Sequence, residues 1–162
     1  LELANSQGTH SDADSSSKRL VLALYDALNS ADSHAVANIL AADLEWWFHG
    51  PPHHQFLMRM LTGDSNDTFR FLPLRIASFG PTVIVEGCDT ARAIAWVHAW
   101  TVADGIVTQV REYFNTALTV TRIHDSDEIL PATSAAGRLP CVWESSVSGR
   151  VGKSVPGLVL AI

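Results

Sequence analysis

The Asp104-Gly105 pair is the feature of this sequence that most limits how the chain can fold. It lies between two runs, 92–102 and 106–115, that are rich in β-branched and aromatic residues. An Asp-Gly pair between two such runs is typical of a two-residue β-hairpin turn. The chain is therefore expected to fold back here, with Ala103 opposite Ile106, and to form an antiparallel sheet.

The other patterns predict an α+β domain in which helices precede most of the strands. Apolar residues at helical spacing predict a first helix that begins near Ser16 or Ser17 and a second that Ser33 caps. Pro52 suits the first turn of a third helix, and Gly63 is placed to end it. The remaining strands are expected at 44–49, at 69–79 with an interruption at Pro73, at 82–88 and at 157–162, whereas 126–138 and 151–156 are expected to be irregular. The last strand is apolar and is expected to pack on this domain or on a partner subunit.

Composition excludes several classes of function. The chain has 162 residues, enough for one domain with a core. Its formal net charge of −6 argues against nucleic acid and anionic membranes as partners. No apolar run approaches the ~20 residues that span a bilayer, so membrane insertion is not expected. No secretory leader opens the sequence, and two cysteines are too few for a disulfide framework, so the expected location is the cytosol, or the cytosol and nucleus.

Several longer strings carry a resemblance to a known family. They are EWWFHGPP at 45–52, WVHAWTV at 96–102, REYFNT at 111–116 and VGKSVPGLVL at 151–160. From about residue 18 to its end, the chain resembles the plant wound-induced protein family. The resemblance implies a cone-shaped nuclear transport factor 2-like (SnoaL-like) fold, in which a curved antiparallel sheet is wrapped by about three helices around a pocket. The changes in composition along the chain predict a mobile polar tail (1–15), the domain (16–123) and a carboxyl-terminal extension with a docked apolar strand (124–162). The family is known for expression on wounding, stress and senescence, which implies no particular activity.

The hairpin register predicts which side chains share a face of the sheet. Counting back from the turn places Ala99 opposite Val110 and Val97 opposite Glu112. This face carries small side chains, so we expect it to line a pocket. The expected ligand-binding residues are Trp46, Trp47, Phe56, Met60, Ala95, Val97, Ala99, Val110 and Phe114. The opposite face is bulky and aromatic, which favours a homodimer interface made by Trp96, His98, Trp100, Arg111 and Tyr113.

Two residues are candidates for proton transfer. Glu112 is a carboxylate on an otherwise apolar face, and such surroundings can raise the pKa of a carboxylate so that it serves as an acid or base. Pairing with a nearby Arg would instead be an ordinary structural role. His49 ends the first strand, near the position where the similar isomerases carry a catalytic Asp, although it can equally fix the turn that follows. His49, His53 and His54 lack the spacing of a zinc site, and no phosphate-binding or dinucleotide motif is present, so neither a metal nor a cofactor is expected.

These observations favour a non-catalytic binding or accessory protein. It would hold a small apolar molecule in the cone and act in plant stress responses or specialised metabolism. The first alternative is a cofactor-independent isomerase or cyclase that uses His49 or Glu112. The second is a dimeric module whose aromatic sheet face binds another protein.

Overall fold

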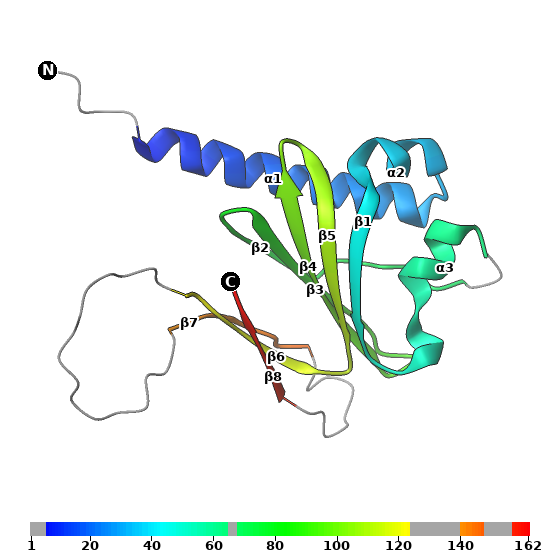
Figure 1. Ribbon diagram of the computed structural model, residues 1–162. Coiled ribbons are helices and arrows are strands. Elements are labelled where there is room, and N and C mark those ends of the chain that lie inside the picture. The colour runs from blue at the N-terminus through cyan, green and yellow to red at the C-terminus, as the bar shows by residue number, and fades with distance from the viewer. Residues whose placement is uncertain (1–5, 65–67, 124–139, 148–156) are drawn as a thin grey trace, which may run out of the picture.

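A long helix lies across one face of a curved sheet, and a smaller sheet lies on the opposite side (Figure 1). The structure is a computed structural model that describes residues 6–64, 68–123, 140–147 and 157–162. Its helices are α1 (Ser6–Asn29), α2 (Ser33–Ile39) and α3 (Phe56–Thr62), and a short 3₁₀ turn, η1 (Pro52–His54), precedes α3. The segments 126–138 and 151–156, which we expected to be irregular, lie outside the described residues.

The main sheet has five strands in the order β1-β5-β4-β3-β2. They are β1 (Leu40–His49), β2 (Arg75–Phe79), β3 (Thr82–Asp89), β4 (Ile94–Ala103) and β5 (Ile106–Phe114). The pairs from β2 to β5 are antiparallel, but β1 runs parallel to β5. The predicted antiparallel sheet is thus a mixed one, because the helical segments between β1 and β2 carry the chain across the sheet.

The second sheet contains β6 (Ala117–Thr121), β7 (Cys141–Glu144) and β8 (Gly157–Ala161), with β6 in the middle. The apolar terminal strand docks in its own chain as β8, parallel to β6. Leu118 and Leu160 of this sheet pack against Val97 and Ala99 of the main sheet. We call that side of the main sheet the outer face, and the side towards α1 and α3 the inner face.

The inner face is filled by aromatic side chains. Trp96 and Trp100 of β4 are fully buried beneath Tyr25 of α1, and Phe71 packs against the same cluster. Asn29, at the end of α1, holds Phe71 in place: its side chain donates to the Phe71 carbonyl at 2.8 Å and accepts from the Phe71 N–H at 3.0 Å. Backbone groups of a segment without regular structure are thereby paired, so the segment can cover the core.

A β-bulge corrects the predicted hairpin register. Ala103 pairs with Ile106 as predicted, but the pairing shifts by one residue at Thr108, so that Thr101 lies opposite Gln109. Beyond the bulge, His98 pairs with Glu112 and Ala99 with Arg111. A one-residue shift changes which side chains of the two strands lie on the same face of the sheet. Beyond the bulge, the predicted sharing of faces between β4 and β5 is therefore wrong.

Several element boundaries also differ from those predicted. Helix α1 begins at Ser6, so most of the predicted polar tail is its first part. Asp32 caps α2 in place of Ser33, through a hydrogen bond from the Ala35 N–H. Residues 69–74 form no strand, and β2 begins only at Arg75. The prediction for Gly63 is confirmed: it ends α3 with a φ of 77°, where glycine is favoured.

Candidate functional site

Five side chains form a continuous hydrogen-bonded chain across the inner face. The Trp100 indole N–H donates to the Tyr25 hydroxyl oxygen at 2.8 Å, and that hydroxyl lies 2.7 Å from His98 Nδ1. His98 Nε2 lies 2.7 Å from Glu112 Oε2, and the Trp46 indole N–H donates to Glu112 Oε1 at 2.8 Å. Tyr25, His98, Trp100 and Glu112 are buried, whereas Trp46 is half-buried. We call this arrangement the Glu112 chain.

The donors and acceptors of the Glu112 chain determine where its protons lie. Burial raises the pKa of Tyr25 well above its ordinary value; the Trp100 hydrogen bond lowers it and the nearby Glu112 charge raises it further. Tyr25 therefore keeps its proton. His98 Nδ1 is the one atom of the Glu112 chain that can accept the Tyr25 proton, so the arrangement that leaves no hydroxyl proton unpaired has Tyr25 donating to His98 Nδ1. His98 then carries its own proton on Nε2 and donates it to an ionised Glu112.

A protonated His98 would break this pattern. Its Nδ1–H would point at Tyr25, and the Tyr25 proton would then have no acceptor within the chain. The arrangement that satisfies every donor has a neutral imidazole and a buried carboxylate anion. Glu112 has two N–H donors and no cationic partner among the described residues. It therefore keeps unused acceptor capacity on the inner face.

The two predicted proton-transfer residues point to opposite faces. In the register of β1 with β5, Phe48 lies beside Glu112 and His49 beside Tyr113. Glu112 is buried on the inner face, whereas His49 is exposed on the outer face with its ring 6.3 Å from that of Tyr113. The two side chains cannot reach one ligand atom together, so a proton-transfer site would use one of them alone.

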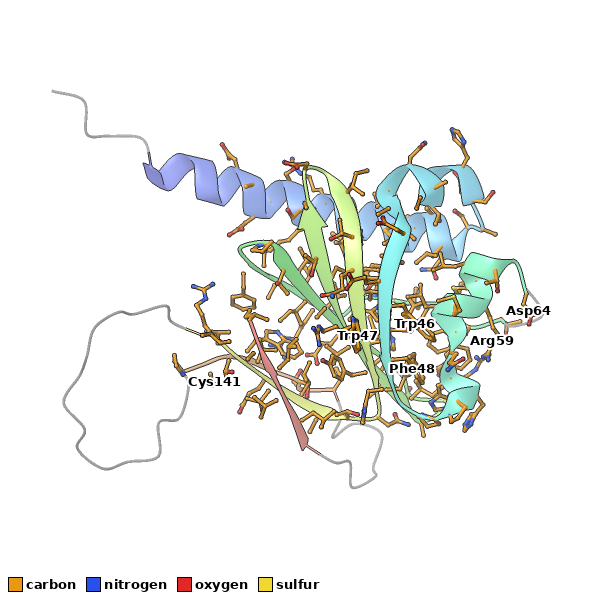
Figure 2. All side chains as sticks on the ribbon, in the orientation of Figure 1. Trp46, Trp47, Phe48, Arg59, Asp64 and Cys141 are labelled. Carbon is orange, nitrogen blue, oxygen red and sulfur yellow. The ribbon has the colours of Figure 1, made fainter. Side chains whose placement is uncertain are left out.

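The predicted ligand-binding residues fall into two groups. Ala95, Val97 and Ala99 lie on the outer face and are buried. Trp46, Phe56, Val110 and Phe114 are packed in the inner core or against it, together with Met60. Figure 2 shows Trp46 and Phe48 on the α3 side of β1 and Trp47 on the other side. Trp47 is 57% exposed, beneath the Arg111 guanidinium.

The predicted interface residues are divided in the same way. Trp96, His98 and Trp100 are buried under the chain's own α1, so they do not form a surface for a second subunit. Arg111 and Tyr113 are half-buried on the outer face. The bulge at Thr108 is the physical reason, because it places the bulky residues of β4 on the opposite face from these two.

Glu86, whose face we did not predict, lies on the outer face and binds the segment that follows β7. It is buried, pairs with Arg75 at 2.6 Å, and accepts from the Ser146 hydroxyl at 2.8 Å and the Ser146 N–H at 3.1 Å.

The described His, Cys, Asp and Glu side chains form no group that could hold a metal. Within the described ranges, none of the helices combines the length and hydropathy needed to cross a membrane.

An apolar pocket of about 540 Å³ opens between α1, α2, β1 and α3. Five alanines line the pocket, and their small side chains keep much of its volume open. The larger apolar walls are Leu28, Val36, Leu40, Met60 and Leu61. Ser33 is the one polar side chain among the described residues that line it. We call it the helix pocket; its full lining is Ala27, Leu28, Ala31, Ser33, Val36, Ala37, Leu40, Ala41, Ala42, Met60, Leu61 and Gly63.

Neither Tyr25 nor the role of His98 in this chain of hydrogen bonds was predicted from the sequence. Tyr25 lies in the apolar stripe of α1, and a hydroxyl within such a stripe signals that it needs a buried partner. The partner is 73 positions away, on a strand whose face the bulge had inverted.

Solved structures show the class of fold. An epoxide hydrolase of M. tuberculosis described as LEH-like is 20% identical, with a TM-score of 0.51 over 63% of this chain and 80% of that one. The protein Bal32a from a soil-derived mobile gene cassette is 17% identical, with a TM-score of 0.51 over 62% of this chain and 90% of that one. The predicted α+β cone, a nuclear transport factor 2-like fold, is confirmed.

Sequence comparison then identifies the family. Residues 58–162 match the family described as wound-induced protein WI12, and the chain belongs to that family. It is 58% identical over 114 residues to Senescence associated gene 20 of Arabidopsis thaliana, and 59% identical over 108 residues to Wound-induced protein 1 of Solanum tuberosum. Each match covers 65% of this chain and the whole relative. The family match includes His98, Trp100 and Glu112, whereas Tyr25 and Trp46 precede it.

Proposed function

We propose that this protein binds a small apolar molecule in the helix pocket and acts as a binding or accessory protein in the wound or senescence response of a plant. The volume of about 540 Å³ lies within the ~300–1,000 Å³ of ordinary ligand sites. The lining favours an apolar ligand because the described residues offer Ser33 as the one polar side chain. The names of the relatives support the setting, not the ligand.

The alanines of the helix pocket are the observation that carries this proposal. Ala37, Ala41 and Ala42 lie on α2 and β1, where a larger apolar residue would occupy the same space. The sequence also predicted a pocket beside small residues, but on β4. Leu28 and Met60 line the helix pocket, whereas Leu24 and Phe56 are buried in the core.

Replacing Ala37 with Phe is expected to weaken binding of the uncharged fluorescent probe N-phenylnaphthylamine by about tenfold or more. Ala37 is exposed on α2, so the ring occupies the pocket without disturbing the core. A fluorescence titration measures the affinity.

Asn38→Phe is the matched control, because Asn38 is the next residue of α2, is also exposed and does not line the pocket. This variant is expected to bind the probe as the parent protein does. Equal affinities in the two variants would contradict the proposal.

Proton transfer at Glu112 is the second candidate function. It is favoured by the ionised carboxylate with a neutral His98 behind it and by the half-buried Trp46 in front. For a β,γ-unsaturated ketone, Glu112 would take the proton from the carbon α to the carbonyl and return it to the γ carbon. Ultraviolet absorbance of the conjugated product tests this, and Glu112→Gln would abolish any such turnover. His49→Ala would leave it unchanged, because His49 lies on the other face.

A further inference from the structure

A second cavity, of about 410 Å³, lies on the outer face and is unlike the helix pocket in its charge. Arg111 and Arg122 line it together with Thr101 and Gln109, and Phe79 and Leu160 contribute apolar walls. No carboxylate side chain is among its lining residues. We call it the arginine groove.

Neither groove arginine has a carboxylate partner among the described residues, but the Arg111 guanidinium interacts with the Tyr113 hydroxyl. Arg75 and Arg92 each have a carboxylate partner, Glu86 at 2.6 Å and Asp89 at 3.6 Å. Within the part of the chain that the structure describes, Arg111 and Arg122 have no ion pair. Glu45, on the neighbouring strand, accepts from the Gln109 amide at 2.8 Å.

The walls of the arginine groove are held by hydrogen bonds and packing. The Ile123 N–H donates to the Ile162 carbonyl oxygen at 2.8 Å, and the Ile162 N–H donates to the Thr121 carbonyl at 2.9 Å. On the other wall, the Arg111 guanidinium lies 5.4 Å from the centre of the Trp47 ring, which restricts its movement. A site with fixed walls loses less entropy when a ligand binds.

We propose that the arginine groove binds a small organic anion with an apolar body, with Arg111 and Arg122 contacting the anionic group. Planar guanidinium groups bind carboxylates and sulfonates through paired, charge-assisted hydrogen bonds. The apolar walls then cover the rest of the molecule. In a chain with a net charge of −6, two neighbouring arginines with no ion pair among the described residues make an anion favourable here.

Two probes with the same apolar body separate the charge from hydrophobicity. Anilinonaphthalene sulfonate carries an anionic group, and N-phenylnaphthylamine lacks it. Arg111→Gln and Arg122→Gln are each expected to weaken the binding affinity for the sulfonate probe by about tenfold. Each should leave the affinity for the uncharged probe unchanged. Added salt should lower the binding affinity for the sulfonate probe and not that for the uncharged probe. Arg111→Lys, which keeps the charge but not the planar fork, should retain part of the affinity.

Arg70→Gln is the control for net charge, because Arg70 is exposed and does not line the groove. It should bind both probes as the parent protein does. The proposal is overturned if the two groove variants bind the sulfonate probe normally, or if Arg70→Gln weakens it equally. It is also overturned if Ala37→Phe in the helix pocket removes the whole preference for the anion. This result is separate from that of the proposed function, which is measured with the uncharged probe.

Discussion

Gly87→Ala is expected to destabilise the protein by about 3 kcal/mol or more. Gly87 lies on β3 opposite Trp96, and an added Cβ would overlap the Trp96 ring and the Leu72 carbonyl oxygen. Trp96 is fully buried between Tyr25 and Phe71, so its ring has no free space into which to move. Chemical denaturation measures the loss in the free energy of unfolding.

Gly157→Ala provides the matched control. Gly157 also lies in a strand, but the nearest atom to an added Cβ is the Ala117 carbonyl oxygen at 3.9 Å. Its effect is expected to be neutral or stabilising by up to ~1 kcal/mol, because alanine loses less backbone entropy than glycine on folding. Similar stabilities for the two variants would mean that the aromatic cluster yields more easily than its burial indicates.

Local signals predicted most of the elements of this fold. The Asp-Gly turn, the cap at Gly63 and the helical stripes of α1 and α3 each depend on residues close in sequence, and the structure contains all of them. The strands of the second sheet were harder. Strands β6 and β7 are only five and four residues long, too short for an alternating pattern to be distinguished from a loop.

The candidate site was less predictable because it depends on one residue of register. Nothing about Thr108 in the sequence distinguishes a bulged residue from a paired one, yet it decides whether Glu112 faces Val97 or His98. The partnership of Tyr25 with His98 also requires knowing how α1 crosses the sheet. The helix pocket, in turn, is built from four separate elements whose alanines have no shared sequence pattern.

Glu112→Gln is expected to destabilise the protein by about 1–3 kcal/mol, although it preserves the shape of the side chain. If the amide oxygen accepts from His98, the amide nitrogen faces the Trp46 N–H, and two donors meet. If the amide is turned over, it donates to His98 Nε2. His98 must then carry its proton on Nδ1, and the Tyr25 proton is left without an acceptor. Denaturation measures the loss, and proton–nitrogen NMR correlation spectra report which His98 nitrogen is protonated.

Glu45→Gln is the control for this substitution, because Glu45 is exposed and its contact is with the Gln109 amide. Its effect should stay within about 0.5 kcal/mol. A similar loss in both variants would show that general charge, not the Glu112 chain, is responsible.

A double-mutant cycle that combines Glu112→Gln with Tyr25→Phe tests the direction of the chain itself. Tyr25→Phe alone leaves the Trp100 N–H without its acceptor and His98 Nδ1 without its donor. In the Tyr25→Phe background there is no hydroxyl proton that needs His98 Nδ1 as its acceptor. The amide at position 112 can then turn over and donate to His98 Nε2 without leaving a further group unpaired. The double variant should therefore be more stable than the sum of the two single losses, by about 1 kcal/mol. Strictly additive losses would mean that Tyr25 does not donate to His98 and that the protons of the Glu112 chain lie on other atoms.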